Sequence, residues 1–178
     1  MTLLIQILIA LAAIVVIMIG IVAMRPSDFR ISRSKLVSAP PSAAFALVND
    51  HHYWGDWSPW EKQDPDLKKT YEGPTSGVGA IYRWSGNNKV GEGSNTITES
   101  RPSEVIRMKL EFLRPFKATN AVEFTFQPQN EQTLVTWTMT GRYNFMAKAM
   151  GLFMNMGKMI GDSFDEGLTK LKSLVERT

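Results

Sequence analysis

One uninterrupted apolar segment near the amino terminus constrains this chain more than any other feature. Residues 3–24 contain Gln6 as their only strongly polar side chain. About 20 apolar residues in a helix, each rising 1.5 Å, cross the roughly 30 Å hydrocarbon core of a bilayer. A single span must satisfy its own backbone amides in lipid, and only a helix does so. The sequence therefore predicts a single-pass transmembrane anchor at residues 1–25, which meets the membrane through residues 3–24.

Two alternatives fit this segment less well. A cleaved signal peptide would begin with Lys or Arg, have a shorter apolar run and end at a small-residue cleavage site, and the segment has none of these. A buried core helix fits poorly because residues 3–24 are apolar on every face. We therefore expect a membrane helix.

The charges after the segment bear on its orientation. Four basic residues against one acidic residue follow the helix: Arg25, Arg30, Arg33 and Lys35 against Asp28. The positive-inside rule then favours a cytoplasmic domain, and a periplasmic or extracytoplasmic placement stays open. The absence of cysteine fits either side.

The rest of the chain has the composition and size of one globular domain. All 20 Lys and Arg and all 17 Asp and Glu residues follow the apolar segment. The net charge of +3 is too small to indicate a nucleic-acid partner, and no basic run is interleaved with aromatic residues. Residues 26–178 are therefore expected to form a single domain that binds no nucleic acid, and its oligomeric state is left open.

The hydrophobic periodicity of most of this domain indicates β-strands. After a strand at 29–37, the pair Pro40-Pro41 precedes a short helix, for which Ser38 or Ser42 is the expected cap. An aromatic segment, residues 51–60, should fold inward as a turn or short helix. Six more strands follow with hairpin spacing, at 67–72, 79–84, 89–101, 104–113, 118–128 and 131–143.

The carboxyl-terminal part is expected to be one long amphipathic helix. Its apolar positions recur at steps of three, four or seven: Phe145, Ala149, Leu152, Met156, Ile160, Gly167, Leu171 and Leu174. A meander and one such helix bury both apolar faces only if the sheet curls around the helix. The predicted fold class is α+β, with a curved antiparallel sheet of about seven strands around the last helix.

Several motifs along residues 29–175 resemble the START-like superfamily, also called SRPBCC or polyketide cyclase/dehydrase-like. They are APPSAAFALVND from Ala39, WSPW from Trp57, GEGSNTITESRPSEVI from Gly91, FTFQP from Phe124 and VTWTMTG from Val135. The resemblance implies a helix-grip domain at residues 26–178, with a deep cavity that in relatives holds sterols, lipids, polyketides or other apolar molecules. The superfamily includes enzymes and carriers, so the fold alone does not give the function.

Alternation along the strands selects the side chains that should face this cavity. Most inward residues are ordinary core in any curled sheet. Together with residues of the aromatic segment and the last helix, the candidate ligand-binding residues are Trp54, Trp57, Trp60, Tyr82, Trp84, Asn95, Met108, Leu110, Phe112, Phe124, Trp137, Met150 and Phe153.

Two features suggest open space rather than filled core. Gly91 and Gly93 share a strand face with Asn95, which leaves room there, although glycines in strands also mark bulges. Asn95 is then either a polar handle for a ligand or an amide satisfied by the backbone. Met146 and Met150 step by four along the predicted helix, where flexible thioethers suit varied apolar guests or simply fill gaps.

Catalytic residues are sparse. No cysteine is present and the two histidines are adjacent, so no metal site is predicted. Asp56 with His51 or His52 is the only acid–base pair that the sequence offers, and no catalytic residue is assigned with it. Phosphate-binding and dinucleotide motifs are absent, so no cofactor is predicted.

The leading hypothesis is noncatalytic binding of an apolar small molecule or lipid by a membrane-anchored domain. One alternative is an enzyme of cyclase, dehydratase or hydrolase type that acts on an apolar substrate in the same cavity. Another is a structural or partner-binding module at the membrane, which would need an exposed aromatic surface at residues 51–60.

Overall fold

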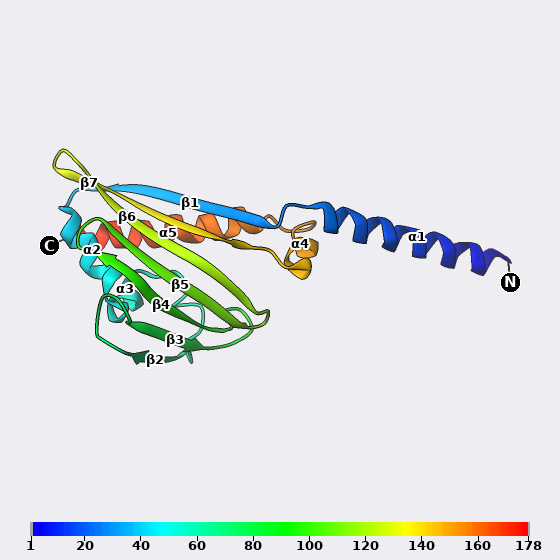
Figure 1. Ribbon diagram of the computed structural model, residues 1–178, viewed down its shortest axis with the longest axis horizontal. Coiled ribbons are helices and arrows are strands. Elements are labelled where there is room, and N and C mark those ends of the chain that lie inside the picture. Colours follow the sequence, from blue (N-terminus) through cyan, green and yellow to red (C-terminus); the bar gives the residue numbers. More distant parts are fainter. Residues whose placement is uncertain (1, 178) are drawn as a thin grey trace.

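Helix α1 (Thr2–Met24) stands apart from the rest of the protein in the computed structural model, which describes residues 2–177 (Figure 1). It has 23 residues and is long and apolar enough to cross a membrane. Val22 is its one buried residue among those described. The expected helix is therefore present, and its span through a bilayer stays a prediction.

A seven-stranded antiparallel sheet forms the body of the domain, in the order β1-β7-β6-β5-β4-β3-β2. The strands are β1 (Asp28–Val37), β2 (Lys68–Glu72), β3 (Ile81–Ser85), β4 (Glu92–Arg101), β5 (Val105–Arg114), β6 (Ala118–Gln129) and β7 (Gln132–Arg142). From β2 to β7 each strand pairs with the next one along the chain, and β1 pairs with β7, so the first and last strands of the chain lie side by side. The predicted α+β helix-grip fold is confirmed.

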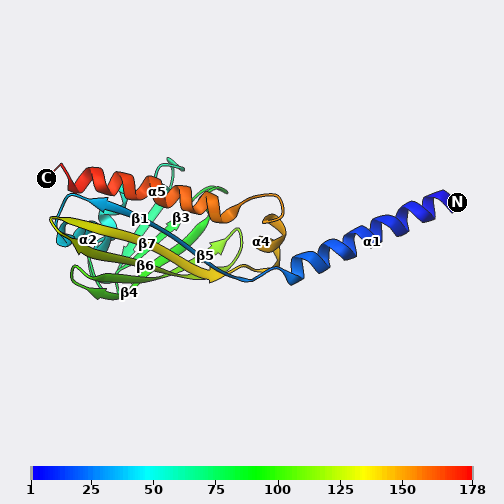
Figure 2. The ribbon, with the colours of Figure 1, turned by 90° about the horizontal axis from the view of Figure 1, so that it is seen from above.

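Short helices follow β1, and two helices end the chain. They are α2 (Pro41–Asn49), the 3-10 helix η1 (His51–Tyr53), α3 (Trp54–Trp57), α4 (Phe145–Met150) and α5 (Met156–Val175). Helix α5 lies along the sheet, while α4 lies at the end of the domain nearest α1 (Figures 1 and 2). Pro40 occupies the N-cap position of α2 and makes no side-chain bond there, so the expected Ser cap is wrong.

The predicted long carboxyl-terminal helix is present as α5, but it begins at Met156 and not at Phe145, because a separate helix, α4, precedes it. Gly151 ends α4, and Asn155 begins α5 by accepting a hydrogen bond from the backbone N–H of Lys158 at 2.9 Å. Asn144 caps α4 in the same way. Two caps within twelve residues therefore start two separate helices. The apolar spacing continues across the break, so the hydrophobic pattern does not reveal it.

The core lies where α5 meets the inner face of the sheet. The ring of Phe164 stacks on Trp137 at 4.1 Å, and Phe124 stacks on its other side at 4.8 Å. Gly167 brings α5 close to this stack, since a Cβ there would lie 2.9 Å from the Trp137 ring. Trp57 packs edge-on against Trp137 at 5.5 Å, which joins α3 to the same core.

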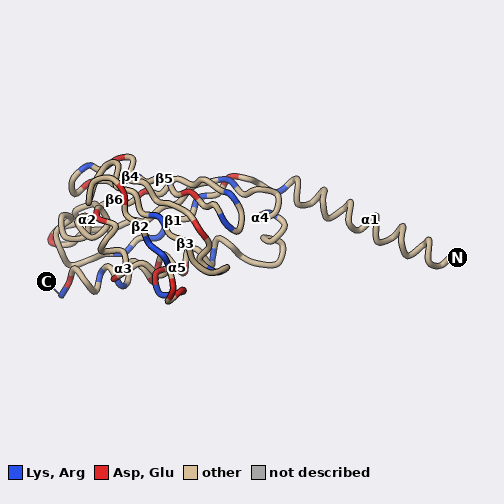
Figure 3. The backbone as a smooth tube through the Cα atoms, turned by 90° about the horizontal axis from the view of Figure 1, so that it is seen from below, with Lys and Arg blue, Asp and Glu red and all other residues tan. Residues whose placement is uncertain are grey.

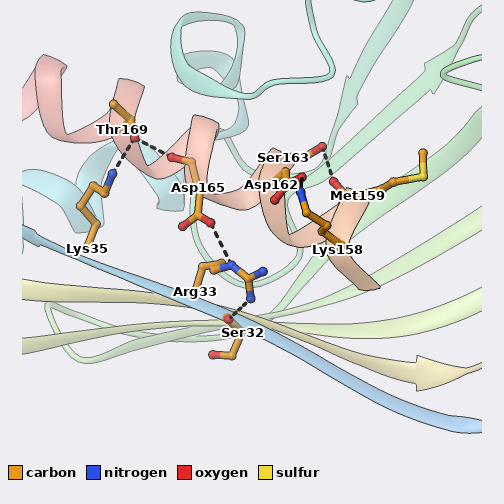
Figure 4. Close-up of polar contacts among 9 residues, drawn as sticks. All are labelled: Ser32, Arg33, Lys35, Lys158, Met159, Asp162, Ser163, Asp165 and Thr169. Carbon is orange, nitrogen blue, oxygen red and sulfur yellow. Dashed lines mark hydrogen bonds and ion pairs between the residues drawn. The ribbon is translucent and has the colours of Figure 1, made fainter. Parts of the chain in front are cut away.

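Polar contacts attach α5 to β1 (Figure 4). Arg33 donates from Nε to Asp165 at 2.9 Å, and Lys35 donates to the hydroxyl of Thr169 at 2.7 Å. A Cβ at Gly161 would clash with the guanidinium of Arg33, so the glycine leaves the space that this side chain occupies. The strand β1, which follows α1 in the chain, therefore also carries the side chains that bind α5.

Candidate functional site

A cavity of about 340 Å³ lies between the inner face of the sheet and α5. Pairing places Trp84, Gly93, Phe112 and Ala118 in one row across β3, β4, β5 and β6. This row is at the end of the sheet nearest α1, because β1 begins there and β7 ends beside it. The strand residues of the lining come mainly from this row and the next, so the cavity occupies the α1-proximal end of the domain. Its volume is within the usual range for small-molecule sites, about 300–1,000 Å³.

Eight of the thirteen candidate ligand-binding residues line this cavity: Trp54, Trp60, Tyr82, Trp84, Asn95, Leu110, Phe112 and Trp137. Trp57, Met108 and Phe124 do not line it and lie in the core, each at most 2% exposed. Alternation gave the correct face for Met108 and Phe124 but not their position along the strand. Counted from the row of Leu110, Met108 lies one row farther from α1 and Phe124 lies two rows farther.

Met150 and Phe153 also lie outside the cavity lining. The helix break after α4 carries them away from the sheet, and Phe153 is 80% exposed. Gly93 does not open the cavity either, because a Cβ there would meet the Trp84 ring and the backbone of Glu111. A register shift between Glu92 and Gly93 marks a bulge, which was the other reading of these glycines.

Two amides lie in the second row of the cavity. Asn95 and Asn120 are both paired with Leu110 across β5, so they sit two strands, or about 10 Å, apart. Each is more than nine-tenths buried, and the Oδ1 of each has no hydrogen-bond partner within the protein. The Nδ2 of Asn95 approaches only the sulfur of Met108, at 3.4 Å. An unpaired buried polar group costs about 1–3 kcal/mol, a cost that the fold bears at both residues.

A third buried polar group on the cavity wall is unpaired. The indole Nε1 of Trp137 has no hydrogen-bond partner within the protein, although the residue is 2% exposed. The residues that line the cavity therefore include aromatic side chains together with one donor and two acceptors that have no partner within the protein. The sequence did not single out Asn120, but it alternates with Val122 and Phe124 and could have been found by the same rule as Asn95.

Glu61 is a second lining residue that was not predicted. It accepts a hydrogen bond from the Tyr82 hydroxyl at 2.5 Å and forms an ion pair with Lys69. Burial and this hydrogen bond raise the pKa of Tyr82 far above its ordinary value, so its hydroxyl stays protonated. No sequence motif signals Glu61, because it lies in the irregular segment between α3 and β2.

The suggested acid–base pair is not assembled. Asp56 and His52 are exposed, and neither lines the cavity. His52 bonds to Asp50 at 2.7 Å, whereas His51 is buried against Trp54 at a ring distance of 5.0 Å. Among residues 2–177, no group of three His, Cys, Asp or Glu side chains is arranged to hold a metal ion.

His51 gives a pH dependence of stability that can be measured. Burial lowers the pKa of His51 from 6.5 to about 4, and neither ring nitrogen has a partner within the protein. Below pH 6.5 the unfolded chain binds a proton at this residue that the folded protein does not, so stability falls as the pH falls from 6.5 toward 4. Between pH 7.5 and 5.0 we expect a loss of about 2 kcal/mol in the free energy of unfolding, measured by urea denaturation in detergent.

The His51→Phe variant should lose this part of the pH dependence. His52→Phe is the matched control, because burial is the main cause of the lowered pKa of His51 and the neighbouring His52 contributes less, so this variant should keep most of the dependence. Equal pH profiles for the native protein and His51→Phe would contradict the assignment.

A family model described as polyketide cyclase / dehydrase and lipid transport matches residues 28–176, the whole domain after α1. The chain belongs to this family. The predicted resemblance to START-like proteins is thereby confirmed. A comparison with curated proteins gave no match.

Solved structures share the fold of this family member. A protein of unknown function from Staphylococcus aureus is 10% identical, with a TM-score of 0.65, and the match covers 86% of this chain and 96% of that one. A protein from Mesorhizobium loti is 16% identical over 84% and 98% of the two chains, with a TM-score of 0.62. One from Chromobacterium violaceum is 16% identical over 83% and 96%, with a TM-score of 0.60. At these identities the likeness concerns the fold alone.

Proposed function

We propose that this protein binds an apolar small molecule or lipid in the cavity between the sheet and α5, and that the ligand carries at least one polar group. The observation that carries the proposal is an aromatic cavity of about 340 Å³ whose wall holds two buried amide oxygens without a partner within the protein, on Asn95 and Asn120. Aromatic walls favour an apolar body, and a few placed polar groups fix its orientation. The family supports the same class of ligand.

The proposal includes a membrane location. Helix α1 would span a bilayer and hold the domain at its surface, with the charges after α1 favouring the cytoplasmic side. Residues 1–25 are then the anchor and residues 26–178 the binding domain.

An enzyme of cyclase or dehydratase type is the second candidate. Its support is the pair of Tyr82 and Glu61 on the cavity wall, where the phenol already donates its O–H to Glu61, so that the phenol oxygen and the carboxylate remain as acceptors for a substrate group. A partner-binding role for residues 51–60 has less support, because Trp54 and Trp57 are at most 6% exposed.

Asn120→Leu tests the ligand-binding proposal. Removing an unpaired buried amide should raise the stability of the protein by about 1 kcal/mol or more, while binding of a ligand with a polar group falls by about tenfold or more. Decanol and decane, which share a chain length, are suitable probes in displacement of a fluorescent apolar dye from the detergent-purified protein. The native protein should prefer decanol, and the variant should lose this preference.

Asn88→Leu, at an exposed turn position, is the matched control and should change neither measurement. Native mass spectrometry of the purified protein provides the direct assay, in which an apolar molecule should remain bound. A native protein that binds neither probe and carries no apolar molecule would end the proposal.

A further inference from the structure

An exposed apolar surface lies beside the carboxyl end of α1. We call it the α4 surface, and it consists of Phe145, Met146, Phe153 and Met154, which are 51%, 49%, 80% and 41% exposed. These side chains come from α4 and the turn that follows it. Four large apolar side chains, gathered within ten residues, are unusual for a face in water and mark a contact with lipid or protein.

The α4 surface is fixed to the end of α1. Lys148 donates from Nζ to the backbone carbonyl of Ala23, and Arg25 donates to the carbonyl of Lys148, both at 3.4 Å. The only buried residue of the described part of α1, Val22, is in the turn that lies against α4. If α1 crosses a bilayer, α4 therefore sits at the depth where α1 leaves it.

The charge around α4 fits a lipid surface. Lys148 is the only charged residue in 143–157, and Figure 3 shows the segment at α4 as largely uncharged. Acidic residues are absent from 132–161, whereas Arg142 and Lys158 flank the apolar segment. Apolar side chains flanked by basic ones are typical of segments that lie in the interface of an anionic bilayer.

The mouth of the cavity opens at the same end. The exposed residues of its lining include Phe116 on the β5–β6 turn, Arg142 at the end of β7 and Asn144 at the start of α4. Phe29 also lines the cavity and follows Met24 by five residues. Its ring stacks on Tyr143 at 4.4 Å, and the N–H of Tyr143 donates to the carbonyl of Ser27 at 2.8 Å.

We propose that α4 and the turn at 151–154 insert into the membrane–water interface of an anionic bilayer, so that the cavity opens directly onto lipid. The proposal rests on α1 as a membrane span. It extends the proposed function by naming the source of the ligand, which would pass from the acyl region of the bilayer into the cavity without crossing water.

Fluorescence at single cysteines tests this contact, because the native chain contains no cysteine. Phe153→Cys, labelled with an environment-sensitive dye, is reconstituted as the full chain in vesicles of phosphatidylcholine and phosphatidylglycerol. An interfacial helix lies about 5–10 Å below the headgroup boundary, so we expect a blue-shifted emission and loss of at least about half of it with nitroxide-labelled lipids. Val78→Cys is the matched control, since Val78 is 59% exposed on the turn before β3, at the other end of the sheet, and should show neither effect.

Each other outcome overturns the proposal. A dye at Phe153→Cys that is unshifted and unquenched places the α4 surface in water. A blue shift without lipid quenching, together with a disulfide-linked dimer of the same variant left unlabelled, assigns this surface to a second copy of the chain. Ile14→Cys reports on α1 itself, and an unquenched dye there would remove the membrane span. None of these signals requires a bound ligand, so failure of ligand binding in the cavity is measured separately.

Discussion

Replacing Ala118 with tryptophan is expected to abolish ligand binding while the domain stays folded. Ala118 begins β6, pairs with Phe112 and lines the cavity near its mouth. An indole at this position projects into open space, so the overpacking that costs about 1–3 kcal/mol in a filled core should be smaller here. In native mass spectrometry the bound apolar molecule should disappear, and displacement of the dye should weaken by at least about tenfold.

Ala121→Trp is the control for this substitution. Ala121 is on the same strand but is exposed on the outer face of the sheet. The variant adds the same indole and should bind ligand as the native protein does. If Ala118→Trp also kept full binding, the cavity would not be the binding site.

Replacing Trp57 with alanine is expected to cause the largest loss of stability. Trp57 is fully buried, packs edge-on against Phe124 at 6.0 Å and Trp137 at 5.5 Å, and donates its indole N–H to the carbonyl of Leu47 at 3.2 Å. Removing a buried aromatic side chain costs about 3–5 kcal/mol. In a chain of this size that corresponds to a fall in Tm of roughly 10 °C, which circular dichroism in detergent would show.

Tyr53→Ala provides the comparison from the same segment. Tyr53 is 46% exposed, so its loss should change the free energy of unfolding by no more than about 0.5 kcal/mol. Equal effects of the two substitutions would mean that residues 51–60 do not form part of the core.

The fold was predictable because strand alternation and hairpin spacing carry most of its information. Each predicted strand lies within three residues of the observed one at both ends, and the inward side of residues such as Met108, Leu110 and Trp137 follows directly. The helix break at Gly151 was hidden because the apolar spacing ran through it. Local capping separates the two helices, with Gly151 at the end of α4 and Asn155 at the start of α5, and a hydrophobic pattern does not contain this short-range effect.

The site was less predictable than the fold. Alternation predicts which face of the sheet a side chain takes. It does not predict where along the strands the cavity lies, because that position depends on how closely α5 approaches the sheet. Gly167 lets α5 approach the sheet at the stack of Phe164 on Trp137, and this stack forms part of the cavity wall. Asn120 lines the cavity and was missed, whereas Phe124, which stacks on Trp137, belongs to the filled core and was included.

The connection between α1 and β1 is only three residues long, from Arg25 to Ser27. Such a segment spans at most about 14 Å, and its carbonyl at Ser27 is bonded to Tyr143 of the domain. With α1 in a bilayer, the domain cannot reach into the bulk solution and keeps nearly one orientation toward the surface. Its encounters would then be confined to lateral diffusion in two dimensions, and it would sample molecules dissolved in its own leaflet far more often than those free in water.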